Sequence, residues 1–319
     1  MTKEETGQET RGNVSALKIG VVGGGLMGHG IAYLLAAAGH RVGVFEPSAE
    51  VRASLPQRLD VITQLLGDDP SVADRISAHE TLPPAVDAAA FVFEAAPEKL
   101  PLKQQIFGEL ENLLAADTIL ASNSSAIPST DIARNLKHRE RVVGTHFWNP
   151  PHLVPLVEVI QNAWTSDAVV ARTIELLRNA GKTAVHVRRD IPGFIGNRLQ
   201  HALKREAIAL IAAGACDAET LDTVVKEGFG ARMAVLGPLE QSDLVGLDLT
   251  LDISNVLVEH LDRTAGPHPF LIEKVKAGKL GMRSGEGFRR WTPEQANEVR
   301  ERLRTFLAAQ AKKKKTKTQ

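Results

Sequence analysis

Three glycines follow a short β-branched run at the spacing Gly23-x-Gly25-x-x-Gly28, and an apolar run comes after them. The first glycine of such a pattern allows a tight turn, the second lets the backbone approach a pyrophosphate, and the third allows close packing of helix on strand. The N-terminus of the predicted helix then directs N–H groups and a positive dipole end at the phosphates. Leu26 and Met27 complete the turn. The pattern predicts a dinucleotide site at residues 23–28.

Glu46 ends the next predicted strand, 21 positions after Gly25. An acidic residue at about 20 positions is expected to accept hydrogen bonds from the ribose hydroxyls of the dinucleotide. Its carboxylate would repel a 2′-phosphate, and the following Pro47 and Ser48 supply no arginine to offset that repulsion. The sequence therefore favours NAD over NADP as cofactor.

His146 ends another predicted strand, at the sheet edge where α/β proteins hold ligands, and Glu158 follows closely enough to fold back toward it. A His–Glu pair suits alcohol oxidation. Imidazole takes the hydroxyl proton while hydride leaves for the nicotinamide, and the carboxylate orients the ring and stabilises the imidazolium. On spacing alone, a structural histidine is the alternative, and most of the 10 histidines are expected to be surface or packing residues.

The elements that position these residues follow an α/β pattern up to about residue 190. Apolar periodicity predicts strands at 16–22, 42–45, 90–93, 118–121, 142–146, 154–160 and 183–187, and helices at 31–38, 51–66, 102–115 and 169–180. Alternating strands and helices predict a mainly parallel, Rossmann-type sheet covered on both faces. Beyond Phe194 the spacing is helical, at 195–213, 218–226, 240–261 and 293–311.

These patterns divide the chain into four parts. We expect a disordered N-terminus at 1–15, an NAD-binding domain at 16–190, an all-α domain at 191–310 and a basic tail at 311–319. The lysines of the tail are expected to form a solvated, frayed end, with a tether to an anionic partner as the alternative.

Five motifs in this order resemble the L-3-hydroxyacyl-CoA dehydrogenase family, and the resemblance extends from about Lys18 to Trp291. They are GGGLMGHGIA at 23–32, ASNSS at 121–125, HFWNP at 146–150, LVEVI at 156–160 and PGFIGNR at 192–198. The resemblance implies an NAD-dependent enzyme that oxidises a 3-hydroxyacyl substrate to the 3-oxo product. It also implies a homodimer formed through the all-α domain.

The resemblance assigns roles to individual residues. His146 would be the general base and Glu158 its partner, while Ser125 would hydrogen-bond the substrate oxygen and the histidine. Asn197, from the second domain, would help to polarise the carbonyl, as a neutral donor can without competing for the proton. Asn149 would support these groups. Positions where the family contacts the cofactor also correspond to Glu94, Lys99 and Asn123.

Some residues depart from the family pattern. Trp148 stands where phenylalanine is more usual, and the usual Ser-Ser-Leu reads Ser-Ala-Ile at 125–127. CoA-using members carry lysines after the residue that corresponds to Glu46, and these lysines grip the CoA phosphates. Here that segment offers only Arg52 and Arg58. The preferred substrate is a short-chain 3-hydroxyacyl-CoA, and the alternative is a free 3-hydroxy acid such as carnitine or gulonate.

Two further alternatives use the same architecture. A 3-hydroxyisobutyrate or 6-phosphogluconate type of enzyme would need a catalytic lysine, for which Lys204 could serve, but the preceding FIGNRL matches the first family. A non-catalytic, crystallin-like protein is the other alternative. The full set of Ser125, His146, Glu158 and Asn197 argues against it.

Composition limits the remaining classes of function. The 319 residues are 43% hydrophobic, which excludes a wholly disordered chain, and 38 basic against 38 acidic residues give no field that would attract nucleic acid or a membrane. The single Cys216 excludes a disulfide framework and a cysteine metal cage, and no metal-ligand spacing is apparent. No signal peptide or membrane span is predicted. We expect a cytoplasmic enzyme of fatty acid metabolism with a small-molecule substrate.

Overall fold

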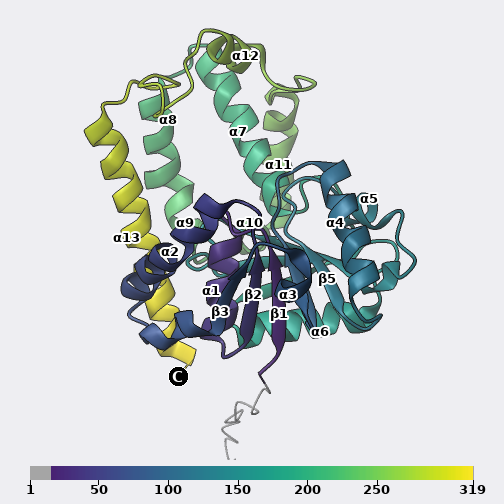
Figure 1. The fold of residues 1–319 in the computed structure, drawn as a ribbon. Helices are drawn as coiled ribbons and strands as arrows, with labels where there is room; N and C mark the ends of the chain where they lie inside the picture. Colours follow the sequence, from purple (N-terminus) through teal and green to yellow (C-terminus); the bar gives the residue numbers. More distant parts are fainter. Residues whose placement is uncertain (1–15, 319) are drawn as a thin grey trace, which may run out of the picture. The chain divides into compact units, whose positions relative to one another are not determined.

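The structure is a computed structural model that describes residues 16–318, so the expected disordered segment 1–15 lies outside the described residues. The chain divides into two compact units. One comprises the chain up to Ile195 together with the part from Thr305 onward, and the other comprises Gly196–Arg304. The N-terminal part of the first unit thus ends at Ile195, five residues after the boundary at 190 that the sequence pattern predicts. Figure 1 shows the α/β part and the helical part of the ribbon.

The first unit is built on one eight-stranded sheet in the order β3-β2-β1-β4-β5-β6-β7-β8. Neighbouring strands are parallel except β6 and β7, which are antiparallel. The order of the first six strands is that of the dinucleotide-binding Rossmann fold. The strands are β1 (Lys18–Val22), β2 (Arg41–Phe45), β3 (Ile76–His79), β4 (Phe91–Glu94), β5 (Ile119–Ser122), β6 (Val142–Phe147), β7 (Leu156–Ile160) and β8 (Thr183–Val187).

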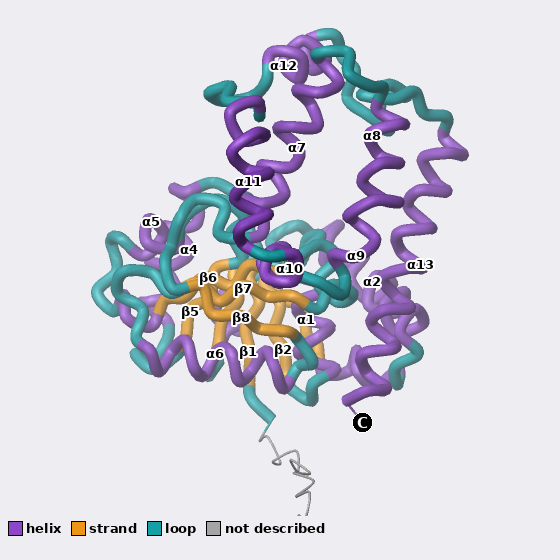
Figure 2. Tube along the Cα trace, turned by 180° about the vertical axis from the view of Figure 1, so that it is seen from behind, coloured by secondary structure: helices purple, strands orange, loops and turns teal. Residues whose placement is uncertain are grey.

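Helices cover both faces of this sheet, as the tube drawing in Figure 2 shows for the side that carries α1 and α6. Alternate strand residues face opposite sides. In β4, for example, Phe91 and Phe93 join the core beneath α1, α2 and α6, whereas Val92 joins the core beneath α3, α4 and α5. The helices are α1 (Gly28–Ala37), α2 (Ala49–Leu66), α3 (Leu82–Val86), α4 (Leu100–Leu113), α5 (Ser129–Ala133) and α6 (Asp167–Asn179).

Two elements of this unit differ from the sequence expectation. The edge strand β3 was not predicted, because its ISAH sequence places Ser77 and His79 in a short, largely exposed strand without an apolar run. The helix α1 begins at Gly28, three residues before the predicted start at 31, since the glycines of the turn give no apolar signal.

The second unit is helical. Its elements are α7 (Gly196–Ala212), α8 (Ala218–Val225), a π-helical turn (Lys226–Gly230), α9 (Ala231–Met233), α10 (Pro238–Val245), α11 (Leu247–Leu257), α12 (Pro269–Lys276) and the first part of α13 (Pro293–Thr318). The single helix predicted at 240–261 is wrong. Gly246 adopts φ +99° and separates α10 from α11, a backbone conformation that glycine tolerates without strain.

Helix α13 belongs to both units, which the sequence did not indicate. Its residues from Thr305 onward belong to the first unit. There Ala308 is buried in the same core as α1 and α2, and Leu307 and Ala311 pack against it. The helix continues through the lysine-rich segment to Thr318, where a frayed end was expected, and Lys312 and Lys313 are exposed.

Candidate active site

The glycine turn between β1 and α1 has the form that a dinucleotide requires. Gly23 adopts φ +99°, and a Cβ on it would lie 2.8 Å from the Ala95 carbonyl oxygen. A Cβ on Gly28 would lie 1.7 Å from the Gly23 oxygen, so helix and turn could not pack as closely with any other residue. At Gly25, by contrast, a Cβ would meet nothing within 4 Å. The open side at Gly25 is where backbone can approach a pyrophosphate, and the residues therefore fit NAD.

Glu46 follows β2, beside this turn. Its Oε2 accepts a hydrogen bond from the Gly24 N–H at 2.9 Å, and its Oε1 accepts one from the Ser48 N–H at 2.9 Å. A carboxylate has about four lone-pair sites, so both oxygens can accept further bonds from ribose hydroxyls. Glu46 thus shapes the turn, and its contact with the cofactor's ribose stays a prediction.

The antiparallel pairing of β6 with β7 brings His146 and Glu158 together. They are directly opposite in the register of the two strands, so their side chains share one face of the sheet. His146 Nδ1 lies 2.7 Å from Glu158 Oε2, and both side chains are buried. Glu158 Oε1 also accepts a hydrogen bond from the Ile195 N–H at 3.0 Å. Because a carboxylate only accepts, Nδ1 carries the proton and Nε2 is the nitrogen that can receive one.

Aromatic rings surround the imidazole. The ring centroids of Trp148 and Phe194 lie 5.4 and 5.5 Å from that of His146. The Trp148 Nε1 atom is buried, and no partner for it occurs among residues 16–318. The walls beside His146 are thus apolar, with one indole N–H donor. The nearby Asn149 is exposed.

The loop after β5 carries Ser125 and Asn123. Asn123 is buried, and its Oδ1 accepts a hydrogen bond at 3.0 Å from the N–H of Phe147, the neighbour of His146. Ser125 is exposed, and its N–H donates to Glu98 Oε1 at 3.0 Å. Thus Asn123 ties this loop to β6, the strand that carries His146, and Glu98 holds the backbone of Ser125.

Glu98 is a positioning group that the motifs did not reveal. Its Oε1 also accepts bonds from Ser124 Oγ at 2.6 Å and from the Ala126 N–H at 3.0 Å. Burial opposes ionisation of this carboxyl. The Ser124 hydroxyl, the backbone N–H groups and Lys103 nevertheless hold its pKa below the ordinary value. A lone acidic residue in the polar stretch before α4 gave no distinct sequence signal.

The predicted cofactor contacts Glu94 and Lys99 lie in different surroundings. Glu94 is fully buried: its Oε1 accepts from Lys103 Nζ at 2.7 Å and its Oε2 from Ser122 Oγ at 2.7 Å. Lys99 is exposed, one residue before α4. Lys103 was not predicted, although a lysine among the apolar residues that open α4 is unusual. The cofactor roles of Glu94 and Lys99 stay predictions.

Asn197 lies in the first turn of α7, in the second unit. Ser125, His146 and Glu158 all belong to the first unit. The role of Asn197 therefore rests on the resemblance of the FIGNR segment and stays a prediction.

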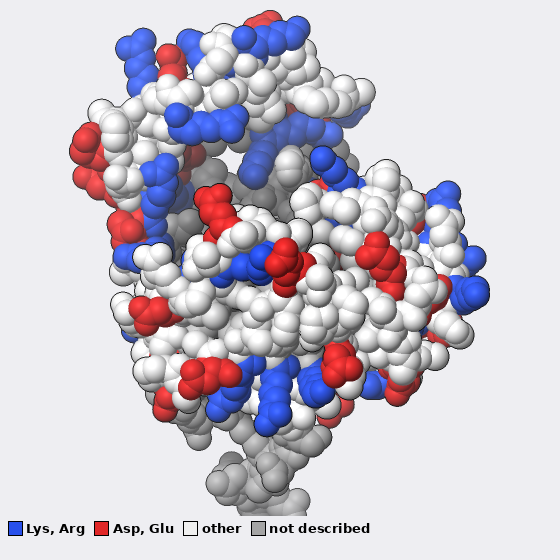
Figure 3. All heavy atoms as spheres, in the orientation of Figure 1, with Lys and Arg blue, Asp and Glu red and all other residues white. Residues whose placement is uncertain are grey.

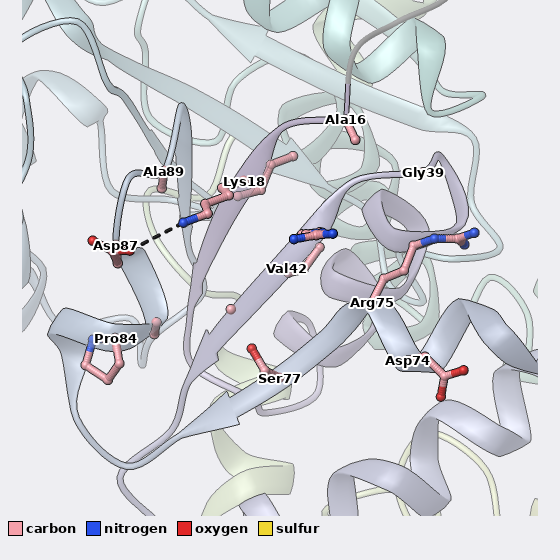
Figure 4. A pocket seen from close by; sticks show the side chains of 14 residues that line it. Ala16, Lys18, Gly39, Val42, Asp74, Arg75, Ser77, Pro84, Asp87 and Ala89 are labelled. Carbon is pink, nitrogen blue, oxygen red and sulfur yellow. Dashed lines mark hydrogen bonds and ion pairs between the residues drawn. The ribbon is translucent and has the colours of Figure 1, made fainter.

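Other parts of the described chain do not add to this site. A cavity of about 700 Å³ opens at the amino ends of the strands, opposite the edge that carries the glycine turn, and Lys18, Arg41, Arg75 and Asp87 are among its lining residues (Figure 4). No group of three or more His, Cys, Asp or Glu side chains within residues 16–318 could hold a metal ion. Within the same residues, no helix has the length and apolarity to cross a membrane. Basic and acidic side chains are interspersed on the face shown in Figure 3.

Comparisons with known proteins identify the family of the chain. Residues 18–191 match the family described as 3-hydroxyacyl-CoA dehydrogenase, NAD binding domain, and residues 193–291 match 3-hydroxyacyl-CoA dehydrogenase, C-terminal domain. A 5-formyl-3-hydroxy-2-methylpyridine 4-carboxylate 5-dehydrogenase of Mesorhizobium japonicum is 37% identical over 296 residues, covering 91% of this chain and 96% of the relative. A probable 3-hydroxybutyryl-CoA dehydrogenase of Bacillus subtilis is 39% identical over 282 residues, covering 85% and 96%.

Solved structures show the same relationship. The crystal structure of 5-formyl-3-hydroxy-2-methylpyridine 4-carboxylic acid 5-dehydrogenase, an NAD+ dependent dismutase, superposes with a TM-score of 0.87 at 33% identity, covering 94% of this chain and 99% of that one. (S)-3-Hydroxybutyryl-CoA dehydrogenase from Ralstonia eutropha gives a TM-score of 0.71 at 31% identity, covering 87% and 100%. The glycine turn, the sheet order and these matches lead to one conclusion: the chain belongs to the 3-hydroxyacyl-CoA dehydrogenase family of NAD-dependent oxidoreductases that act on CH–OH groups.

Proposed function

We propose that this protein oxidises the 3-hydroxyl carbon of a small 3-hydroxyacyl compound, with His146 as the general base. Bound NAD supplies the hydride acceptor. The Nε2 atom of His146 takes the hydroxyl proton, and the Glu158 carboxylate at Nδ1 fixes the ring and stabilises the imidazolium that forms. Ser125 donates to the substrate oxygen. Asn197 is the further neutral donor in this proposal, as the resemblance implies.

One observation carries this proposal: a buried imidazole whose Nδ1 lies 2.7 Å from a buried carboxylate, directly opposite it on the antiparallel strands. A histidine that served only packing would not need a charged partner buried beside it, since removal of a carboxylate from water is costly. The apolar rings of Trp148 and Phe194 limit water near the base, which strengthens the pair's mutual attraction.

The structure adds an observation that favours a free acid over a CoA thioester. Arg52 donates to the carbonyl oxygens of Glu46 and Pro47 at 2.7 and 2.8 Å. Arg58 donates to backbone oxygens of the glycine turn. The two arginines of α2 therefore already bind backbone oxygens of the chain, which argues against a role in gripping CoA phosphates. The name of the Mesorhizobium relative includes a free carboxylate. We therefore favour a substrate with a free carboxylate.

A substrate panel followed by NADH absorbance tests the reaction and the substrate together. The panel holds 3-hydroxybutyryl-CoA, free 3-hydroxybutyrate, L-carnitine, L-gulonate and 5-formyl-3-hydroxy-2-methylpyridine 4-carboxylate. We expect turnover of a free acid to exceed that of the CoA ester. We also expect His146→Gln to lower kcat at least about a hundredfold without loss of NADH binding, because general acid–base catalysis contributes about 10² to 10⁴. Faster turnover of the CoA ester would reverse the substrate assignment. An unchanged kcat in His146→Gln would refute the assignment of His146 as the general base.

We also propose that the second unit joins a second copy of the chain. None of the helices α7 to α12 contains a buried residue. On α11, Leu247, Leu251 and Val256 are each at least 60% exposed. Soluble proteins seldom leave so many large apolar side chains in water unless another surface covers them. Sedimentation velocity should give a dimer, and Leu251→Glu should shift it toward monomer. A wild-type protein that stays monomeric at micromolar concentration would end this proposal.

A further inference from the structure

Arg58 lies behind the glycine turn, in contact with its backbone. The guanidinium Nη1 donates to the Gly24 carbonyl oxygen at 2.9 Å, and Nη2 donates to the Gly25 oxygen at 2.9 Å. These bonds link α2 to the turn across more than 30 positions of sequence. The sequence motifs gave Arg58 only a possible contact with a CoA phosphate. Its position indicates a different role.

The register of α2 fixes where this side chain lies. Leu55 and Ile62 are buried against the sheet, and Arg58 is three residues after the first and four before the second. Residues three and four apart share a helix face. Arg58 therefore extends from the packed side of α2 toward the turn. Burial lowers its pKa, and the nearby Glu46 carboxylate opposes that change, so the arginine stays charged.

The bonds to two successive carbonyls decide which way the turn's N–H groups point. In a trans peptide, the C=O of one residue and the N–H of the next point in opposite directions. With the Gly24 and Gly25 oxygens held toward Arg58, the N–H groups of Gly25 and Leu26 are directed away from it. In the described part of the chain, neither N–H has a protein partner. A Cβ on Gly25 would meet nothing within 4 Å, so the turn is open at this residue.

His29 completes the arrangement. Its Nδ1 lies 2.6 Å from Arg58 Nη2 and 2.8 Å from the Gly25 carbonyl oxygen. Burial, and then the Arg58 charge, lower the pKa of His29 against a raising effect of the Gly25 carbonyl. Nδ1 can accept from Arg58 only without a hydrogen and can donate to Gly25 only with one, so the ring tautomer selects one of these two contacts. The two carbonyl oxygens are the acceptors that fix Arg58, and His29 packs against the same groups.

We propose that Arg58 is the positioning residue of the cofactor site: its guanidinium holds the Gly24 and Gly25 carbonyls so that the N–H groups of Gly25 and Leu26 are presented to the pyrophosphate of NAD. Its positive charge behind the turn adds to the attraction for the anion. Glu46 holds the Gly24 N–H from the opposite side. The Gly24 peptide groups are therefore held by one acid and one base before the cofactor arrives.

Arg58→Gln and Arg58→Lys test this role in the apoenzyme. NADH affinity is measured by fluorescence titration without substrate, and ADP and adenosine are measured by displacement of NADH. Arg58→Gln should weaken NADH about tenfold or more, as loss of a charge-assisted bond implies. The affinity for ADP should fall by a similar factor, whereas the affinity for adenosine, which lacks the pyrophosphate, should change less than about twofold. Arg58→Lys keeps the charge but is shorter and lacks the planar fork that places one nitrogen at each carbonyl, so it should behave like Arg58→Gln.

Arg141→Gln is the matched control. Arg141 is a buried arginine of the same unit that donates to the carbonyl oxygens of Ala115 and Glu111, away from the turn. This variant should lower Tm without changing NADH affinity. A normal NADH affinity in Arg58→Gln would overturn the proposal, as would full recovery in Arg58→Lys. NADPH is titrated in the same way. A loss of NADPH affinity with unchanged NADH affinity would overturn the proposal and make Arg58 a ligand of a 2′-phosphate. If Arg58→Gln fails to fold, the Arg58→Lys affinity decides.

Discussion

Replacement of Glu158 by glutamine tests the proposed catalytic pair most directly. The carboxylate accepts hydrogen bonds from His146 Nδ1 at 2.7 Å and from the Ile195 N–H at 3.0 Å, one on each oxygen. Glutamine keeps the size of the side chain but has only one acceptor oxygen. At least one of the two bonds must be lost, and the negative charge is lost with it.

The rate loss follows from the charge that forms during the reaction. When His146 takes the substrate proton, a positive imidazolium forms beside the Glu158 carboxylate, with charge centres about 4 Å apart. At an effective dielectric constant of about 20, such a pair is stabilised by about 4 kcal/mol. At about 1.4 kcal/mol per tenfold in rate, the loss corresponds to about 10³-fold in kcat.

The assay is steady-state NADH production at saturating NAD, with the best substrate of the panel. Binding of NADH should be unchanged, because Glu158 lies on β7 and the glycine turn follows β1, four places away in the sheet order. Glu111→Gln is the matched control: Glu111 accepts backbone N–H groups of Lys137 and His138 outside the site. A loss below about tenfold in Glu158→Gln, or an equal loss in Glu111→Gln, would refute the assignment of this pair.

Three other residues give predictions that equilibrium unfolding can check. Burial, then the charges of His29 and Lys182, lower the pKa of His152 to about 4. Below pH 6.5 the unfolded chain therefore takes up a proton at His152 that the folded chain does not bind. The free energy of unfolding should fall by up to about 1.4 kcal/mol per pH unit until about pH 4, and it should fall less steeply in His152→Gln. Parallel pH dependence of the two proteins would contradict this. Lys103→Met should cost about 3 kcal/mol or more in urea, because it leaves the buried Glu94 carboxylate without its cation, and a cost under 1 kcal/mol would show that the pair is dispensable. Trp148→Phe removes a buried donor without a described partner together with part of the ring volume, so the free energy of unfolding should fall by no more than about 1.5 kcal/mol, and a drop of about 3 kcal/mol or more would indicate a lost bond to the indole.

The sequence predicted the sheet well where the strands are continuous apolar segments. The runs at 16–22, 42–45 and 90–93 all became central strands, because a parallel sheet covered on both faces needs continuous apolar segments. The edge strand β3 was missed because one side of it meets solvent and its residues are polar. The break at Gly246 was missed because apolar spacing continues through the glycine, whose positive φ is a backbone property that periodicity does not report.

The candidate site was predictable in its residues and not in its geometry. Glu158 was expected to fold back toward His146, but only the antiparallel register of β6 and β7 places the two directly opposite each other. Arg58 was noted only as one of two basic residues after Glu46. Its contacts depend on how α2 packs beside the turn, which is a tertiary property. Glu98 acts on a loop 26 to 29 positions away, and no local pattern reports such a distance.

The acidic residues of the first unit show why occupancy of a carboxylate matters more than its position in a motif. Glu94 is fully buried, and a lysine, a serine hydroxyl and the Ala96 N–H already bind its oxygens. A ligand could reach it only by displacing these donors. Glu46 is partly exposed, and two backbone bonds leave acceptor capacity for a ribose. Glu94 is the last residue of β4 and Glu46 directly follows β2, at the same edge of the sheet. The donors around each of them favour cofactor contact for Glu46 and support of the loop after β5 for Glu94.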